Sequence, residues 1–258
     1  MKKILILGVS GMLGHSLYRY LSEKTNVEVY GTLRHPVNKG HFSEAIQANL
    51  ITHVDVLNQD GLIALFNTVK PDVVINCVGL VKQLPNAHDP LAVLPINSLL
   101  PHRLAQLSAL MGARFIQIST DCVFSGKKGL YTEEDVCDAT DLYGVSKKIG
   151  EVTDLSNALT LRAPFIGREL TSCYALIDWF LSQKNTVQGY TGAIYSGLPT
   201  VELARVIHEY VLPFDDLSGL YHVSSEPIDK YTLLKLVAEI YGKSIEIIPE
   251  HQFKMDRS

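Results

Sequence analysis

The chain has 258 residues and a formal net charge of −4, with 47% hydrophobic and 19% charged residues. This composition is typical of a globular protein, and the charge excludes a strongly basic nucleic-acid-binding surface. The four cysteines lack CxxC spacing, and no uncharged apolar run is long enough to span a bilayer. We therefore expect a cytoplasmic protein with reduced thiols and with neither a nucleic-acid nor a membrane partner.

The first two thirds of the chain alternate short apolar runs with helical patterns. The run Ile4–Leu7 follows two lysines but ends at Gly8, which favours a buried strand over the start of a secretory signal. Leu13, Leu17 and Leu21 then recur every fourth residue, as on one helix face. Further strands are predicted at 27–30, 53–56, 73–76, 115–119 and 159–162, and further helices at 62–69, 99–111 and 143–152. This alternation predicts an α/β fold with a doubly wound parallel sheet, covered by helices on both faces.

After residue 162 the regular alternation breaks. Helices are predicted at 176–181, 201–211 and 233–241, and strands at 220–223 and 245–248. We therefore predict a domain of residues 1–162 and a smaller α/β lobe of residues 163–258 that is partly interleaved with the first.

Three glycines stand where the first strand turns into the first helix, in the segment Gly8-Val-Ser-Gly11-Met-Leu-Gly14. A sharp turn needs a residue that tolerates positive φ, and a pyrophosphate approaches closely only where a side chain is missing. The helix start also offers free N–H groups and a positive dipole end to an anion. The spacing is GxxGxxG, and its place between a strand and a helix predicts a dinucleotide-binding turn rather than a turn that only packs helix on strand.

The second strand ends in Thr32-Leu33-Arg34, where an NAD enzyme usually places an acidic residue on the ribose 2′-hydroxyl. No acid is present here. We interpret Arg34 as a cation for a 2′-phosphate rather than as a solvated loop residue, so that NADP(H) is the preferred cofactor and NAD(H) stays possible.

Two further segments are expected beside the cofactor. Asp55 and Val56 are placed to flank the adenine ring, and Cys77, Val78 and Gly79 end the fourth strand where the cofactor crosses the sheet. No histidine stands near Cys77 in the sequence, so we expect a small buried side chain rather than a nucleophile.

Tyr143 and Lys147 stand four residues apart, on one face of a predicted helix. A tyrosine hydroxyl has an ordinary pKa near ~10, and a nearby positive charge lowers it toward the range useful for acid–base work. Upstream, Thr120 follows the fifth strand and is placed to hydrogen-bond a substrate carbonyl oxygen beside the phenol. The turn, the strand-end hydroxyl and the YxxxK pair, in this order, predict a site that protonates a carbonyl oxygen next to a nicotinamide.

These motifs resemble the extended short-chain dehydrogenase/reductase family and, more narrowly, its dTDP-4-dehydrorhamnose reductase branch. The segments that carry the resemblance are Gly8–Gly14, Ser119-Thr-Asp-Cys-Val-Phe-Ser-Gly126 and Tyr143-Gly-Val-Ser-Lys-Lys-Ile-Gly-Glu151. The resemblance covers nearly the whole chain, most strongly up to about residue 167. It implies a Rossmann domain with a small C-terminal substrate lobe, commonly paired as a dimer.

The resemblance also implies roles for particular residues. Thr120, Tyr143 and Lys147 form the catalytic triad, and the segment that binds the pyrophosphate comprises Gly8, Ser10, Gly11, Met12, Leu13 and Gly14. The implied reaction is NADPH-dependent reduction of a nucleotide-linked 4-keto-6-deoxy sugar, with a dTDP or an N-acetylated UDP sugar as substrate. Such a reaction serves the synthesis of cell-surface polysaccharide precursors.

The substrate side is less specific in the sequence. Lys82 and Gln83 follow the strand that the cofactor crosses and can reach a sugar or a phosphate. Lys82 can equally be an exposed loop residue that does not contact the substrate. Asp121 stands beside Thr120 as a further acid that can face the substrate. The nine histidines form no HExxH pair, so we expect no metal site.

Two alternatives to a reductase stay open from the sequence. Relatives in this branch include a non-catalytic, nucleotide-binding regulatory subunit of methionine adenosyltransferase, although an intact Thr120/Tyr143/Lys147 set favours an enzyme. A nucleotide-sugar epimerase or dehydratase, which recycles a tightly held NAD, is the other alternative.

Overall fold

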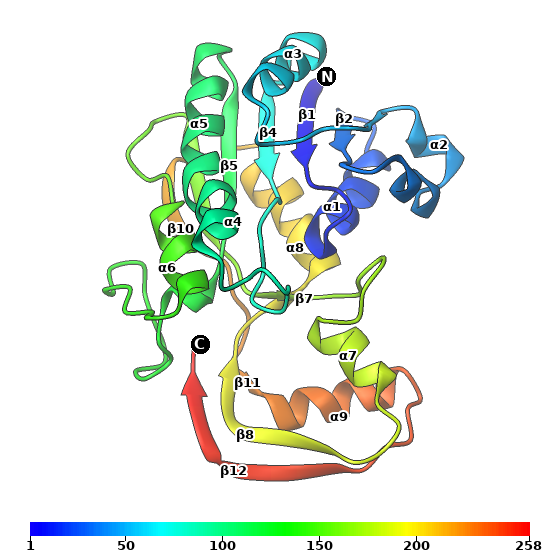
Figure 1. Cartoon of the computed structure of the whole chain (residues 1–258), viewed down its shortest axis with the longest axis vertical. Coiled ribbons are helices and arrows are strands. Elements are labelled where there is room, and N and C mark those ends of the chain that lie inside the picture. The colour runs from blue at the N-terminus through cyan, green and yellow to red at the C-terminus, as the bar shows by residue number, and fades with distance from the viewer.

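Seven parallel strands form the central sheet of the computed structural model, which describes residues 1–258 (Figure 1). Their order across the sheet is β10-β6-β5-β4-β1-β2-β3. The bounds are β1 Lys2–Leu7, β2 Val27–Thr32, β3 Leu50–Ile51, β4 Val73–Asn76, β5 Arg114–Ser119, β6 Ala158–Arg162 and β10 Gly219–His222. The strand order reverses direction at β1, so the loops after β1 and β4 diverge and leave a crevice at the carboxyl edge, where sheets of this type bind ligands.

Successive side chains of β1 supply two separate hydrophobic cores. Ile4 and Ile6 belong to a cluster of 23 buried residues, whereas Leu5 and Leu7 belong to a cluster of 15. Side chains of a strand alternate between the two faces of a sheet, so an unbroken apolar run is what a strand covered on both faces requires. The predicted doubly wound α/β sheet is thereby confirmed.

Helices cover both faces of this sheet. The larger cluster is closed by α1 (Met12–Ser22), by α8 (Thr200–Val206) and by the π-helical turn η4 (Ile207–Val211) that continues α8. The smaller cluster is closed by α3 (Gln59–Val69) and α5 (Leu100–Leu110).

The predicted long helical stretch is built in three pieces. These are α4 (Pro90–Leu94), the π-helical turn η2 (Pro95–Leu99) and α5, with Pro95 and Pro101 each in a first turn. Proline lacks an N–H group and cannot make the usual helical hydrogen bond, so the helix widens locally at this point. The next helix, α6 (Leu142–Ile149), packs against η2 through Asn97 and Ser98.

The small lobe lies at the carboxyl edge of the large sheet (Figure 1). Its sheet has the order β11-β8-β12, and its core contains Phe180, Val187 and Leu233. The other strands and helices after residue 162 are β7 Phe165–Ile166, α7 Leu176–Ser182, β8 Val187–Tyr195, β9 Leu198–Pro199, β11 Ile228–Asp229, α9 Lys230–Ile240 and β12 Ile247–Asp256. Three short helices belong to the first part of the chain: η1 Pro36–His41, α2 Glu44–Gln47 and η3 Asp121–Val123. Between β9 and β11 the chain returns to the large sheet as β10. No helix has the length and apolar character needed to cross a membrane.

Two predicted strands are placed differently in the structure. The third strand is Leu50–Ile51 rather than 53–56, because His53 has a φ of +62° and cannot continue an extended strand. The last strand begins at Ile247 and runs to Asp256, well beyond the apolar run 245–248, because its pairing with β8 extends past Pro249 through a register shift.

Candidate functional site

A cavity of about 650 Å³ lies between the carboxyl edge of the large sheet and the small lobe. Twelve of the predicted site residues line it: Gly11, Met12, Leu13, Cys77, Val78, Gly79, Lys82, Gln83, Thr120, Asp121, Tyr143 and Lys147. The other six, Gly8, Ser10, Gly14, Arg34, Asp55 and Val56, lie outside its lining. The fold therefore brings the glycine turn and the predicted triad to one place, from three separate parts of the sequence.

The glycine turn has the geometry that a phosphate group needs. Gly8 has a φ of +84°, and a Cβ atom there would lie 2.8 Å from a methyl group of Val78. A Cβ at Gly14 would collide with the Gly8 carbonyl, so this glycine allows α1 to pack closely on the turn. Gly11 precedes α1, and neither a capping side chain nor an acidic residue occupies the first helical turn. The N–H groups at this end of α1 thus stay available to an anion, which fits a pyrophosphate.

Arg34, Asp55 and Val56, which do not line the cavity, differ in exposure and in contacts. Arg34 is exposed one residue beyond the buried Leu33, and its guanidinium makes no ion pair or hydrogen bond. The Asp55 carboxylate accepts a hydrogen bond from the backbone N–H of Leu57, and Val56 is buried in the smaller core cluster. Arg34 is thus a free cation near the carboxyl end of β2, as binding of a 2′-phosphate requires.

Thr120 caps the short helix η3 that follows β5. Its hydroxyl accepts a hydrogen bond from the Cys122 N–H and donates one to Asp121 Oδ1 over 2.9 Å. The structure therefore fixes the Thr120 hydroxyl at the strand end, where it lines the cavity beside Tyr143.

Tyr143 is in the first turn of α6. The helix begins after Asp141, whose side chain accepts a hydrogen bond from the Gly144 N–H over 3.0 Å. The second Asp141 oxygen is paired with Lys82, whose ammonium lies 5.4 Å from the centre of the Tyr143 ring. The expectation that a nearby positive charge lowers the pKa of Tyr143 is wrong, because burial raises this pKa above its ordinary value and the neighbouring Cys122 and Asp121 add to the effect. The phenol is therefore fully protonated at neutral pH.

Lys147 lies one helical turn further along, buried beneath the cavity. Its ammonium donates a hydrogen bond to the Ile118 carbonyl over 2.7 Å. Burial lowers the pKa of Lys147 to about 8, although the nearby Glu151 acts in the opposite direction. Cys77 is close by, and burial raises the pKa of its thiol to about 12, so it is a neutral packing residue at physiological pH.

A buried ion pair supports these residues from behind. Glu151 accepts hydrogen bonds from Ser119 over 2.8 Å and from Arg162 over 2.8 and 2.9 Å. These contacts join the ends of β5 and β6 to the segment that follows α6. Burial acts to raise the pKa of Glu151, but the hydrogen bonds and charge of Arg162 outweigh it, so the carboxylate stays ionised.

Sequence reasoning missed the part of the cavity that the small lobe supplies. Tyr195, Lys230, Phe253, Met255 and Arg257 line it from β8, α9 and β12 and from just beyond β12. Arg257 donates a hydrogen bond to the Phe124 carbonyl over 3.0 Å. None of these residues belongs to a local motif, and the pairing of β8 with β11 and with β12 brings them to the site.

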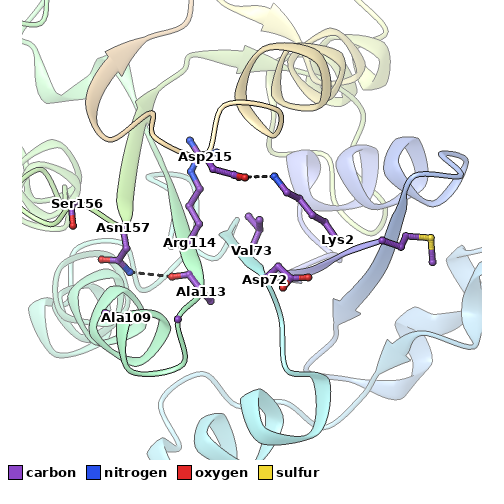
Figure 2. A pocket seen from close by; sticks show the side chains of 11 residues that line it. Lys2, Asp72, Val73, Ala109, Ala113, Arg114, Ser156, Asn157 and Asp215 are labelled. Carbon is purple, nitrogen blue, oxygen red and sulfur yellow. Dashed lines mark hydrogen bonds and ion pairs between the residues drawn. The ribbon is translucent and has the colours of Figure 1, made fainter.

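A second cavity, of about 770 Å³, lies at the opposite end of the large sheet (Figure 2). Several of its charged and polar side chains are bound within the protein: Lys2 pairs with Asp215, Asn157 donates to the Ala113 carbonyl, and Arg114 donates to the carbonyls of Val211 and Leu217. It contains none of the predicted site residues. The predicted site residues that line a cavity thus gather at the carboxyl edge of the sheet.

The fold and the site together define an extended short-chain dehydrogenase/reductase. The model of the RmlD substrate binding domain family matches residues 1–254, and the chain belongs to this family. It is 25% identical over 236 residues to a dTDP-4-dehydrorhamnose reductase from Aggregatibacter actinomycetemcomitans, which covers 88% of this chain and 74% of that protein. It is 30% identical over 172 residues to methionine adenosyltransferase 2 subunit beta from Rattus norvegicus, which covers 66% of this chain but only 48% of that protein.

A solved structure shows the same fold. The dTDP-4-dehydrorhamnose reductase from Bacillus anthracis, crystallised in complex with NADP, matches with a TM-score of 0.75 at 19% identity. The match covers 97% of this chain and 84% of that one. The predicted Rossmann-type fold with a small C-terminal lobe agrees with this likeness.

Proposed function

We propose that this protein is an NADPH-dependent reductase of a nucleotide-linked 4-keto-6-deoxy sugar, in the synthesis of cell-surface polysaccharide precursors. One observation carries the proposal: Thr120, Tyr143 and Lys147 line the same cavity as the glycine turn at the start of α1. The similarity to a dTDP-4-dehydrorhamnose reductase supports the sugar class, with a dTDP sugar or an N-acetylated UDP sugar as the substrate.

Different residues of the chain bind different parts of the cofactor. The N–H groups at the start of α1 hold the pyrophosphate, and Arg34 binds the 2′-phosphate that distinguishes NADP(H). Asp55 and Val56 flank the adenine, and Cys77, Val78 and Gly79 line the path toward the nicotinamide. When bound, the reduced nicotinamide supplies the hydride that the carbonyl carbon accepts.

Protonation of the carbonyl oxygen is the task of Tyr143. Its raised pKa keeps the phenol protonated before the reaction, which is the state that a proton donor needs. Thr120 holds the carbonyl oxygen beside that phenol once its single hydroxyl proton turns from Asp121 to that oxygen. The buried Lys147 ammonium stabilises the negative charge left when the Tyr143 proton has moved. Lys147 also holds the nicotinamide ribose. Lys82, Gln83 and Asp121 face the sugar nucleotide.

A second candidate is favoured by the 30% identity to subunit beta of methionine adenosyltransferase 2. In this case the protein binds NADP(H) and another protein but performs no reduction. An epimerase or a dehydratase is a third candidate, in which a bound NAD+ accepts hydride from the sugar and returns it within one turnover, so that the net redox state does not change.

The experiment offers dTDP- and UDP-linked 4-keto-6-deoxy sugars with NADPH and follows the loss of NADPH absorbance, with product analysis by mass spectrometry. We expect stoichiometric oxidation of NADPH and a 4-hydroxy product with one of these sugars. Tight NADP(H) binding without turnover of any ketone would instead support the regulatory subunit. Conversion of a dTDP- or UDP-linked hexose that carries a 4-hydroxyl group, without net change in the cofactor, would support the epimerase or the dehydratase.

We further propose the division into a cofactor domain, 1–162, and a substrate lobe, 163–258, in a cytoplasmic homodimer. Three apolar side chains support the dimer: Leu99 at the end of η2 is 49% exposed, and Val145 and Ile149, one turn apart on α6, are 38% and 50% exposed. We propose that a second copy of the chain covers this apolar surface.

A further inference from the structure

Tyr195 brings an unpaired phenol to the site. It is the last residue of β8 and lines the same cavity as Tyr143. Its hydroxyl oxygen is screened from solvent and has no hydrogen-bond partner within the protein. Buried polar groups are almost always paired, and an unpaired one costs free energy, so the position of this hydroxyl needs a reason.

The surroundings of Tyr195 place its hydroxyl between the two lobes. The ring packs against the core of the small lobe, whereas the hydroxyl lies over Gly197, close to the Pro164 carbonyl in the segment after β6. A side chain at Gly197 would collide with this hydroxyl. The absence of a side chain at Gly197 thus makes room for a phenol at the carboxyl edge of the large sheet.

The chemistry around the hydroxyl points to one kind of ligand group. Burial raises the pKa of Tyr195, and Asp121 and Cys122 add to this effect, so the phenol is a neutral donor at physiological pH. Asp121 is an acceptor that lines the same cavity, and its Oδ1 atom already accepts from Thr120. No hydrogen bond joins Tyr195 to Asp121, although both residues line the same cavity. An alcohol group, which donates and accepts at once, complements both.

We propose that Tyr195 is a substrate-binding residue whose phenol donates a hydrogen bond to a hexose hydroxyl that neighbours the carbonyl held by Thr120 and Tyr143. A rotation of the Tyr195 side chain, which already lines the cavity, brings its buried hydroxyl to the sugar. This inference rests on the proposed function, because the ligand is the hexose of the nucleotide sugar. Since the hydroxyl is unpaired in the free protein, its hydrogen bond contributes to sugar binding and not to folding.

The test replaces Tyr195 by Phe in the full chain and measures two quantities with opposite expected signs. The unfolding temperature stays equal or rises, because an unpaired buried hydroxyl is removed. The affinity for dTDP-rhamnose, measured by titration calorimetry, falls roughly tenfold, and KM for the 4-keto sugar rises by a similar factor. The affinities for dTDP alone and for NADPH do not change. The control is Tyr190→Phe, on the same strand but outside the cavity lining, which leaves all of these quantities unchanged.

Each other outcome counts against the inference. Unchanged affinity for dTDP-rhamnose in Tyr195→Phe, with a native protein that binds and reduces its sugar, would overturn the role of Tyr195 and leave the proposed function intact. A lower unfolding temperature with equal losses for dTDP and dTDP-rhamnose would show a structural role instead. A native protein that neither binds dTDP- or UDP-sugars nor reduces them would refute the proposed function, and the role of Tyr195 with it.

Discussion

Lys147 is the residue whose charge depends most directly on pH in the working range. In the proposed reaction its ammonium stabilises the Tyr143 phenolate, and burial lowers its pKa to about 8. Because the pKa of a cation is lowered, the charged form is present below this value and is lost above it. We therefore expect kcat/KM for the ketone to fall as pH rises through about 8.

The matched variant is Lys147→Arg, whose guanidinium stays charged throughout the accessible range. It is expected to work more slowly, but without the alkaline fall near pH 8. A native profile that stays flat through this region would contradict the role assigned to the Lys147 charge.

Arg34 supplies a second prediction at the level of a single residue. Its unpaired guanidinium follows β2, and a charge-assisted hydrogen bond to a 2′-phosphate is worth about 1.5–3 kcal/mol. Arg34→Ala should therefore weaken NADPH binding at least about tenfold and leave NADH binding nearly unchanged. Arg103, an exposed cation on α5, provides the control variant Arg103→Ala. Equal losses for both cofactors, measured by fluorescence titration, would refute the assignment.

At the scale of the elements, the Glu151–Arg162 pair joins β5, β6 and the end of α6. Both side chains are almost fully buried, with 1% and 2% exposure. Removing one partner of such a pair leaves an uncompensated buried charge, which typically costs about 3–5 kcal/mol. We expect Glu151→Ala to lower the free energy of unfolding by about this amount, measured by urea denaturation.

The control for this prediction is Glu202→Ala, which breaks an ion pair with Arg205 on the surface of α8. Solvent screens that pair, so the free energy of unfolding should stay close to that of the native protein. If the two variants lost equal stability, the buried network would not be what fixes the ends of β5 and β6.

The elements themselves were predictable where the sequence pattern is local. The run Ile4–Leu7, the glycine turn and the Tyr143–Lys147 spacing each contain their own signal, and the structure places them as expected. The strand predicted at 53–56 was wrong, because the left-handed backbone of His53 leaves no trace in apolar periodicity. The length of β12 was also missed, because its polar second half is held by pairing with β8 and not by burial.

The distinction between local and long-range signals also explains which part of the candidate site could be predicted from the sequence. The half of the cavity built from strand ends could be predicted, since parallel strands bring their carboxyl ends to one edge. Tyr195 and Arg257 could not, because their positions depend on how the nine-residue strand β8 pairs with β11 and β12, which are distant from it in the sequence.

At the scale of the whole molecule, the proposed dimer predicts a concentration-dependent assembly. Leu99, Val145 and Ile149 would be covered by the second copy. Ile149→Lys places a charge in this apolar surface and should convert the dimer into a monomer in sedimentation velocity runs. The control is Ile240→Lys, at a residue 77% exposed on α9, away from this surface, which should sediment like the native protein. A native protein that sediments as a monomer at all concentrations would contradict the homodimer.

In the proposed reaction, this protein transfers hydride from NADPH to a sugar carbonyl while Tyr143 supplies the proton. The most direct measurement uses NADPH that carries deuterium at the transferable position, together with a nucleotide-linked 4-keto-6-deoxy sugar, and analyses the product by mass spectrometry. We predict one deuterium on carbon 4 of the reduced sugar. We also predict none with Tyr143→Phe, although this variant binds NADPH as well as the native protein does. Cofactor that keeps its deuterium in the presence of the native protein and every such sugar would contradict the account.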